Sequence, residues 1–445
     1  MAEHQIITEG INPIIDRKYK IWRIRAFWGT WLAYAGFYLC RKTVAVAQPA
    51  YMDEFGWKAI DVGIILSGYL TAYAIGQFIN GILGDKLGSR IMLGIGLVLT
   101  ILMNLLYGFS YTILFMFILW TVNGYAQSFG WPSVVKGMSN WFSVRERGKI
   151  MGPWGTCYTA GDAVATALAS FVIGIAAVKT VTRMDGSTID VPEWHWIFWI
   201  AAFTLVVITA IVMILFRNKP EDVGLPDITT YHRQAREQTE ASKSSNIELW
   251  KNTKDVLSRG PVWVLGLTYF GIKFIRYMFM LWLPTYLSDV RNFDYDIAGY
   301  NAVFLSIAGV LGTFIASWLS DTVFRSRRAP ISVIMLLGLA CSIYFFGIAP
   351  VSLIPIAVAM VGFLTYGPDF VVSAVAVMDF GSRKGASTAA GFVNGMGSIG
   401  AAIMPTIVGL VEMLWGWGAV FYLLIIFSLI CAGLMATMWN KVGTD

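Results

Sequence analysis

Charged residues are scarce in this sequence. Asp, Glu, Lys and Arg make up 13% of its 445 residues, whereas 57% are hydrophobic. An ordinary soluble domain carries about 25% charged residues. A soluble chain of this size could not keep so much apolar surface away from water, because its own surface must be hydrated. The composition therefore excludes a soluble enzyme, a nucleic-acid-binding protein and a disordered chain. It predicts a protein that crosses the lipid bilayer several times.

Residues that form disulfides or bind metals are also few. The four cysteines lie in apolar runs without paired spacing, so we expect small buried side chains and no disulfide framework. The three histidines are scattered, and no metal-ligand cluster or cofactor motif stands out. Residues 1–25 are polar and basic, without the apolar core of a cleaved signal peptide. We therefore expect no metal, no cofactor, no enzyme activity and no cleaved leader.

Twelve long apolar runs dominate the rest of the chain. About 20 apolar residues cross a bilayer as a helix, and a helix satisfies its own backbone hydrogen bonds within lipid. We expect membrane-spanning helices at residues 26–52, 62–84, 91–111, 112–135, 150–178, 194–216, 261–288, 297–320, 329–349, 350–378, 385–411 and 413–438. The sequence thus predicts an all-α membrane protein with two six-helix bundles, at 26–216 and 261–438. A polar linker at 217–260 joins them, and a short tail follows at 439–445.

Basic residues lie mainly on one side of the predicted membrane. If the N-terminus is cytoplasmic, the only basic residues in the loops on the opposite side are Lys58, Lys179, Arg183 and Arg291. An excess of Lys and Arg marks the cytoplasmic loops of membrane proteins. We therefore expect both termini in the cytoplasm, in a multi-pass protein of the inner (plasma) membrane.

An internal repeat relates the two halves of the sequence. Three pairs of residues recur at an offset of 235 or 236 positions: Asp85 with Asp321, Arg41 with Arg276, and Pro132 with Pro368. Coincidence would have to produce nearly the same spacing three times, so we interpret the two bundles as pseudo-symmetric copies. Transporters built from repeats bind substrate near the bilayer midplane between the halves, and expose it to the two sides in turn.

Several charges lie within the predicted spans. They are five cations and two carboxylates: Arg41, Lys42, Lys136, Lys273 and Arg276, with Asp162 and Asp369. A central Arg costs about 2.5–3.5 kcal/mol on insertion scales, so it needs a reason. Ion pairing satisfies only some of these cations. Two arginines at matching depth, one in each bundle, favour a phosphate dianion over a monocarboxylate, because the guanidinium donates bidentately and stays charged.

Polar and aromatic residues accompany the two arginines. Tyr34 and Tyr38 share a helical face with Arg41, and a Tyr hydroxyl can donate to a phosphate or sugar oxygen. The neutral amides of Gln77 and Asn394 are candidates for recognising hydroxyl groups. Beside the two arginines, the expected substrate-binding residues are Tyr34, Tyr38, Lys42, Gln77, Lys136, Tyr158, Asp162, Lys273, Asp369 and Asn394.

The two carboxylates have three interpretations that the sequence leaves open. Asp162 and Asp369 can pair with a Lys or Arg, carry a proton, or contact polar groups of the substrate. If one of them carries a proton, the chain is instead a proton-coupled carrier of organic carboxylates.

Short motifs resemble those of a known family. The stretch Gly81-Ile-Leu-Gly-Asp85-Lys-Leu-Gly88-Ser-Arg90 resembles the signature of the major facilitator superfamily. Five further motifs resemble the organophosphate:phosphate antiporter family: Tyr38-Leu-Cys-Arg41-Lys42, Gly130-Trp131-Pro132, Asp222-Val-Gly-Leu-Pro226, Tyr366-Gly367-Pro368 and Ser387-Thr-Ala-Ala-Gly-Phe392. The resemblance runs from about residue 20 to 440. It implies exchange of an organic phosphate for inorganic phosphate, with the phosphate group bound by Arg41 and Arg276.

The chain departs from the glycerol-phosphate branch of that family. The resemblance implies a lysine there at the position of Gln77, a histidine at Tyr158, a glutamate at Ser306 and a tyrosine at Lys273. Asp369 has no counterpart in that branch. These departures favour a larger sugar phosphate, such as a hexose phosphate, over glycerol-3-phosphate. The family also includes a receptor-like member that senses hexose phosphate, so a sensor with little flux remains an alternative.

The expected mechanism is a rocker switch in a monomer. Two unpaired arginines brought together in a low dielectric repel each other, so closure is expected mainly with a bound dianion, which makes transport an exchange. We expect Asp85 and Arg90, with Asp321 and Arg325, to latch the cytoplasmic side when the cavity faces outward.

Overall fold

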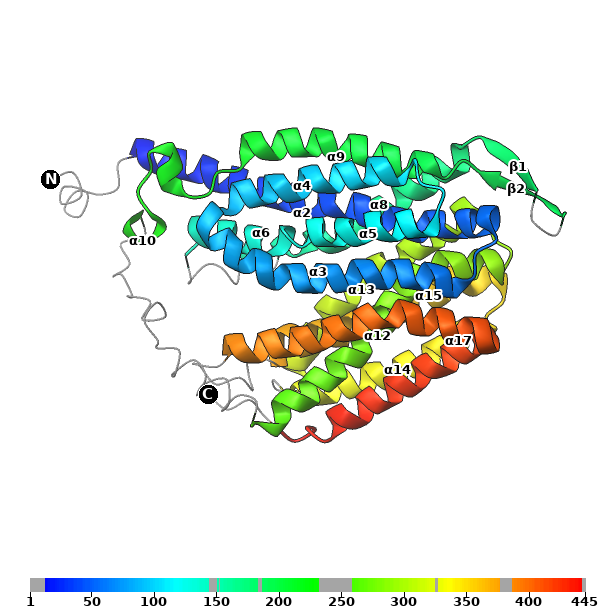
Figure 1. Ribbon diagram of the computed structural model, residues 1–445. Coiled ribbons are helices and arrows are strands. Elements are labelled where there is room, and N and C mark those ends of the chain that lie inside the picture. Colours follow the sequence, from blue (N-terminus) through cyan, green and yellow to red (C-terminus); the bar gives the residue numbers. More distant parts are fainter. Residues whose placement is uncertain are drawn as a thin grey trace.

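The computed structural model describes residues 13–143, 150–151, 153–182, 186–231, 258–324, 327–376 and 386–441. The first group of helices, here called the N lobe, contains α2 (Pro13–Phe55), α3 (Ala59–Leu87), α4 (Ser89–Tyr107), α5 (Ile113–Gln127), α6 (Gly130–Trp141), α8 (Thr156–Ile175) and α9 (His195–Leu215). The second group, the C lobe, contains α12 (Gly260–Asp289), α13 (Tyr295–Thr322), α14 (Arg328–Ile348), α15 (Ile354–Phe370) and α17 (Ala386–Ala436). The two groups lie side by side, with the start of α2 and the C-terminal end of α17 at the same end, here called the terminal end (Figure 1).

The described helices account for twelve membrane crossings. Within the described residues, nine helical segments are long and apolar enough to span a bilayer. The other crossings are α2, the α5–α6 pair and the second limb of α17. The helices α5 and α6 have only 15 and 12 residues, and α17 is two helices merged across Gly416, whose φ of 75° favours glycine. The predicted all-α membrane architecture is confirmed.

Some local predictions need correction. The predicted span 112–135 is not one helix, because it is interrupted at residues 128–129 between α5 and α6 and continues to Trp141. An antiparallel hairpin of β1 (Val178–Thr182) and β2 (Thr188–Pro192), which hydropathy did not predict, joins α8 to α9 at the end opposite the termini (Figure 1). Cys40, Cys157 and Cys431 are buried as expected, but Cys341 is exposed on α14.

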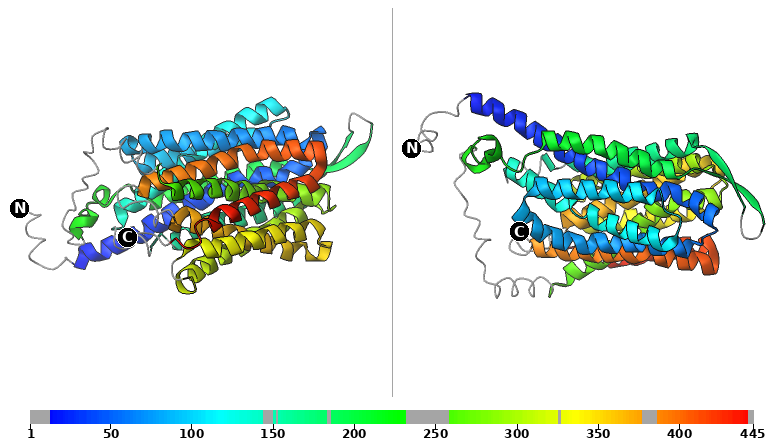
Figure 2. Two further views of the ribbon diagram at one scale, coloured as in Figure 1. Left: turned by 90° about the horizontal axis from the view of Figure 1, so that it is seen from below. Right: turned by 45° about the horizontal axis from the view of Figure 1, so that its top comes forward.

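The first helix begins at Pro13, well before the predicted start of the first span. Its first turns project beyond the other helices (Figure 2). Tyr19 stacks on Tyr231, with ring centroids 3.8 Å apart, so the described start of the linker packs against α2. Hydrogen bonds from Lys20 and Tyr231 hold the pKa of the Asp16 carboxyl below its usual range. Linker residues 232–257 lie outside the described chain.

Close backbone contacts join the lobes near the hairpin. A Cβ on Gly63 of α3 would lie 2.5 Å from the carbonyl oxygen of Pro405 on α17, so only glycine fits there. The Thr406 hydroxyl lies 2.8 Å from the Ser67 hydroxyl in the same contact. These contacts hold α3 and α17 together at the hairpin end.

Side chains of α2 strengthen this closure. Gln48 Nε2 donates to the carbonyl oxygen of Leu281 at 2.8 Å and also to the Thr285 hydroxyl, both on α12. The Tyr295 hydroxyl of α13 donates to Asp53 at 2.7 Å. The lobes are therefore closed at the hairpin end.

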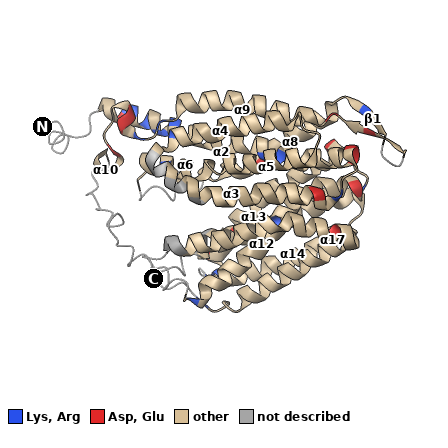
Figure 3. Cartoon of the chain, in the orientation of Figure 1, with Lys and Arg blue, Asp and Glu red and all other residues tan. Residues whose placement is uncertain are grey.

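Few charged residues lie along the helices. Figure 3 shows basic residues on the first part of α2 and acidic residues gathered at the hairpin end, with a small number of charges between the two ends. Such a distribution fits a helical core surrounded by lipid. The cytoplasmic placement of the termini remains a prediction.

Candidate functional site

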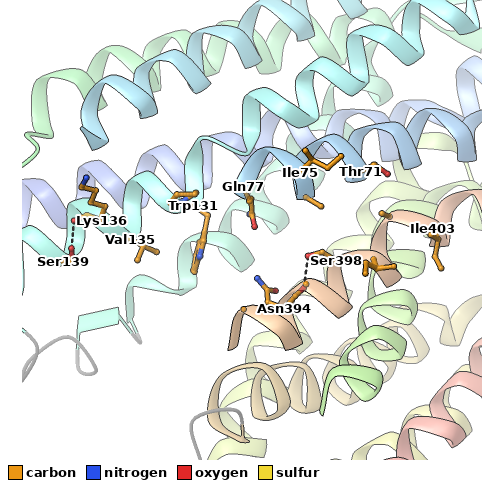
Figure 4. A pocket seen from close by; sticks show the side chains of 16 residues that line it. Thr71, Ile75, Gln77, Trp131, Val135, Lys136, Ser139, Asn394, Ser398 and Ile403 are labelled. Atoms are coloured by element: carbon orange, nitrogen blue, oxygen red, sulfur yellow. Dashed lines mark hydrogen bonds between the residues drawn. The ribbon is translucent and has the colours of Figure 1, made fainter. Parts of the chain in front are cut away.

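A cavity of about 790 Å³ lies between the lobes, in the half of the molecule nearer the termini. Three predicted site residues line it: Gln77 on α3, Lys136 on α6 and Asn394 on α17. In Figure 4, Gln77 and Trp131 of the N lobe face Asn394 and Ser398 of the C lobe. Most of the lining is apolar, and amide, hydroxyl and indole groups from both lobes are set into it, where they can bind the hydroxyl groups of a ligand.

Lys273 connects this cavity with the buried charges. Its Nζ donates to Asn394 Oδ1 at 3.1 Å and lies 5.0 Å from the ring centre of Tyr269. It is also within electrostatic range of Arg41 and Arg276. Neither arginine is among the residues that line the cavity, so the arginines form a deeper layer behind it.

Arg41 is held by neutral and aromatic groups. Its Nε donates to Gln127 Oε1 at 2.9 Å, and its Cζ lies 4.6 Å and 4.8 Å from the ring centres of Tyr38 and Tyr73. Gln127 Oε1 also accepts a hydrogen bond from Tyr69 at 2.8 Å. Within the described chain, the buried Nη2 of Arg41 has no hydrogen-bond partner. A buried cationic donor without a partner is unfavourable, and an anion that accepts its hydrogen bond would stabilise it.

Arg276 has a different environment. Its Nη1 donates to Asp369 Oδ2 at 3.1 Å, and its Cζ lies 4.5 Å from the ring centre of Tyr366. Tyr158 of the N lobe lies 6.0 Å from the same Cζ, so this C-lobe arginine reaches the boundary between the lobes. Arg276 Nε has no partner among the described residues. One edge of this guanidinium is thus occupied by a carboxylate.

The second carboxylate links the lobes. Asp162 Oδ1 lies 3.3 Å from Lys42 Nζ, and its Oδ2 accepts a hydrogen bond from the Ser306 hydroxyl of the C lobe. Lys42 Nζ also donates to the C-lobe carbonyl oxygen of Met280 at 2.8 Å. Of the three interpretations for Asp162 and Asp369, ion pairing is the one that the structure contains.

A contact across the lobe boundary brings the two arginines into one region. Lys42, the neighbour of Arg41, donates to the carbonyl oxygen of Met280, which lies one helical turn after Arg276 on α12. Tyr34 packs against Tyr38 and against Trp131, with ring centroids 6.0 Å and 5.3 Å apart. The predicted site residues thus fall into two groups: Gln77, Lys136 and Asn394 line the cavity, and the two arginines with their ion pairs and tyrosines lie outside its lining.

The predicted latch lies at the other end of the lobes. Arg90 Nη2 donates to a backbone carbonyl of α9 at 2.7 Å, and Asp321 forms an ion pair with Arg328 of its own lobe. Arg325 and the side chain of Asp85 lie outside the described residues. Each described latch residue is thus held within its own lobe, and the latch itself stays a prediction.

Three contributors to the site were missed by the sequence analysis. Tyr73 lies one helical turn before Gln77 on α3, and that spacing could have indicated it. Tyr366 belongs to a motif that was recognised, but no role was assigned to it. Gln127 ends α5 at the break before α6, and an apolar run gives no signal for such a break.

Comparisons with known proteins identify the family of this chain. Residues 30–405 match the profile described as Major Facilitator Superfamily. The chain is 31% identical to the glycerol-3-phosphate transporter of Bacillus subtilis (strain 168), covering 96% of this chain and 94% of that protein. It is 28% identical to a probable hexose phosphate transport protein of Chlamydia trachomatis serovar D (98% and 95% covered). It is 27% identical to the membrane sensor protein UhpC of Escherichia coli (strain K12) (99% and 97% covered).

Solved structures show the same fold. A bacterial homolog of the human lysosomal transporter Spinster, inward-facing and unoccupied, superposes with a TM-score of 0.75 at 13% identity, covering 93% of this chain and 96% of that chain. A mutant of the nucleoside transporter NupG superposes with a TM-score of 0.70 at 14% identity, covering 94% of this chain and 100% of that chain. None of these proteins is an enzyme. The chain belongs to the major facilitator superfamily, within its organophosphate:phosphate antiporter family, as a multi-pass membrane protein.

Proposed function

We propose that this protein exchanges an organic phosphate, such as a hexose phosphate, for inorganic phosphate by alternating access. The observation that carries the proposal is the buried Nη2 of Arg41, which has no hydrogen-bond partner among the described residues, together with Arg276, which reaches the boundary between the lobes from the other side. A phosphate dianion has several oxygens and can accept hydrogen bonds from two guanidinium groups at once. The names of the glycerol-3-phosphate and hexose phosphate relatives support this substrate class.

The charge of the deep layer supports a dianion. This layer contains four cations, Arg41, Lys42, Lys273 and Arg276, and two carboxylates, Asp162 and Asp369. The cations therefore exceed the carboxylates by two. A phosphate ester carries about −1.5 to −2 charges at neutral pH, so one phosphate group removes this excess. The rest of the substrate is then expected to be neutral.

The cavity suits a neutral polyol attached to that phosphate. Gln77, Asn394 and the hydroxyls of Ser139 and Ser398 provide donors and acceptors for sugar hydroxyls. The partly exposed Trp131 offers an apolar face to the C–H side of a sugar ring. A cavity of about 790 Å³ has room for a hexose, which favours hexose phosphate over the smaller glycerol-3-phosphate.

The closure at the hairpin end defines the state of the carrier. If the protein lies in a bacterial inner membrane with both termini in the cytoplasm, the closed hairpin end faces away from the cytoplasm. The cavity then faces the cytoplasm. A bound dianion draws Arg41 and Arg276 together, and the latch then replaces the contacts at the hairpin end. Since each half is built from its own helices, we propose that a single chain is sufficient for this motion.

Counterflow in proteoliposomes tests the proposal. Vesicles loaded with inorganic phosphate should take up labelled glucose-6-phosphate without a pH gradient. In competition, glucose-6-phosphate should be more effective than glycerol-3-phosphate or phosphoglycerates. Dependence on a pH gradient, with organic carboxylates as competitors, would instead indicate a proton-coupled carboxylate carrier.

The similarity to UhpC favours a second candidate, a membrane sensor. A sensor binds its ligand at the same arginines but moves little of it across the membrane. Saturable binding of glucose-6-phosphate without counterflow would identify the sensor. Rapid counterflow would exclude it.

A further inference from the structure

We propose that Asp369 is an internal counter-ion for Arg276 that competes with substrate phosphate and gives this carrier net phosphate transport in addition to exchange. The inference rests on the proposed function, since it concerns the same phosphate site. Four observations support it: the unequal surroundings of the two arginines, the position of the ion pair within one lobe, a second cation near Asp369, and the irregular helix that follows Asp369.

The two arginines are not equivalent before a ligand arrives. The side chains of Arg276 and Asp369 are each only 11% exposed, and their ion pair measures 3.1 Å. Arg41 is instead surrounded by Gln127 and the rings of Tyr38 and Tyr73, which carry no formal charge. The empty site therefore contains one neutralised arginine and one that is not paired with a carboxylate in the described chain.

The location of the pair decides what happens during the conformational change. Arg276 lies on α12 and Asp369 on α15, so both belong to the C lobe and move together when the lobes rock. The pair formed by Lys42 and Asp162 differs, because Ser306 and Met280 of the other lobe bind it and must be released. Asp369 can thus neutralise Arg276 in every state of the empty carrier.

This neutralisation removes the main obstacle to return of the empty carrier. Strict exchange requires that two unpaired guanidinium groups resist being enclosed together in a low dielectric. With Asp369 in place, Arg41 and Lys273 are the two cations of this layer without a carboxylate partner in the described chain, and the charge of Arg41 is spread over two aromatic faces while Lys273 donates to the Asn394 amide. The empty carrier can therefore close and reopen on the other side, which produces net flux.

The structure also offers Asp369 an alternative partner when phosphate binds. Lys273 lies one helical turn before Arg276 on the same face of α12, so the carboxylate that pairs with Arg276 can turn toward that ammonium while phosphate takes Arg276. Asp369 is followed by a π-helical segment, Val371–Ala376, after Pro368 has interrupted the regular hydrogen bonding of α15. Irregular turns of this kind are common at functional sites, and they allow a side chain to change position at low cost.

Efflux measurements test the inference. Proteoliposomes loaded with labelled phosphate are diluted into medium with or without phosphate, with the membrane potential clamped by valinomycin and potassium. For the wild type, efflux into phosphate-free medium should clearly exceed that from protein-free vesicles. Asp369→Asn should lose most of this net efflux but keep exchange. It should also bind phosphate about tenfold more tightly, because the competing carboxylate is gone.

Two further variants separate the counter-ion role from a general structural effect. Asp369→Glu keeps a carboxylate and should retain net efflux. Asp190→Asn removes an exposed carboxylate on the hairpin and should change neither flux. If Asp369→Asn fails to assemble, the ratio of net efflux to exchange in the wild type decides the question.

Specific results would overturn the inference. Wild-type efflux into phosphate-free medium equal to that of protein-free vesicles, together with rapid exchange, would show that Asp369 does not permit return of the empty carrier. An unchanged ratio of net efflux to exchange in Asp369→Asn would exclude the counter-ion role. Absence of both fluxes and of phosphate binding in the wild type would instead refute the proposed function, and this inference with it.

Discussion

Replacement of Arg41 by Lys is the most direct test of the phosphate site. The substitution keeps the positive charge but removes the planar fork that can donate two hydrogen bonds to phosphate. The surroundings are expected to tolerate it. Gln127 Oε1 loses the hydrogen bond from Arg41 Nε but keeps the one from Tyr69 at 2.8 Å, so no buried acceptor is left without a partner.

The size of the effect follows from the lost contact. A hydrogen bond to a charged group contributes about 1.5–3 kcal/mol, and a lysine in place of Arg41 makes at least one fewer such bond to phosphate. That loss corresponds to binding weakened by about 10- to 150-fold. For Arg276→Lys we expect exchange to be abolished, because the single ammonium lacks the planar fork and cannot bind Asp369 and a substrate phosphate in the way that the guanidinium can.

Phosphate binding to the purified protein and phosphate exchange in proteoliposomes measure the effect of Arg41→Lys. A matched control is Arg25→Lys, since Arg25 is an exposed arginine of the same helix that stacks over Trp22. The control should bind phosphate as the wild type does. If Arg41→Lys binds phosphate with an affinity within twofold of the wild type, the guanidinium of Arg41 has no role in binding. If Arg25→Lys loses as much affinity, the effect comes from a disturbance of the helix and not from the phosphate site.

Three further changes test other parts of the site. Gln77→Ala should raise the KM for sugar phosphate by about 2- to 12-fold, which corresponds to the loss of one neutral hydrogen bond. The KM for inorganic phosphate should not change. Equal changes for both ligands in competition assays would contradict a contact between Gln77 and the sugar. Ser306→Ala removes the cross-lobe hydrogen bond to Asp162 and should lower stability in detergent by about 1 kcal/mol, measured by thermal unfolding, whereas an unchanged Tm would show that this bond contributes nothing. A disulfide between cysteines replacing Ser67 and Thr406, two short side chains whose hydroxyls lie 2.8 Å apart, in a background without native cysteines, should stop exchange until reductant is added, and continued exchange would contradict opening at the hairpin end.

The membrane architecture could be predicted because lipid imposes a simple rule. A helix must bury its backbone and present about 20 apolar residues, so hydropathy alone located the spans. The same rule made the central arginines conspicuous. Hydropathy does not report interruptions, however. The break between α5 and α6 and the bend at Gly416 lie inside apolar sequence, and the first turns of α2 are helical although they are polar.

The partners of the buried charges could not be predicted for a related reason. The sequence shows that cations outnumber carboxylates within the spans. It does not show which helices face each other, because that depends on the packing of helices that are far apart in the chain. The structure assigns Lys42 to Asp162 and Arg276 to Asp369. This assignment changes the expected mechanism. If both arginines were unpaired, strict exchange would follow from their repulsion. With Arg276 already neutralised inside its own lobe, the barrier to return of the empty carrier depends on Arg41 and Lys273, so the degree of coupling becomes a property of one carboxylate that a single substitution can alter.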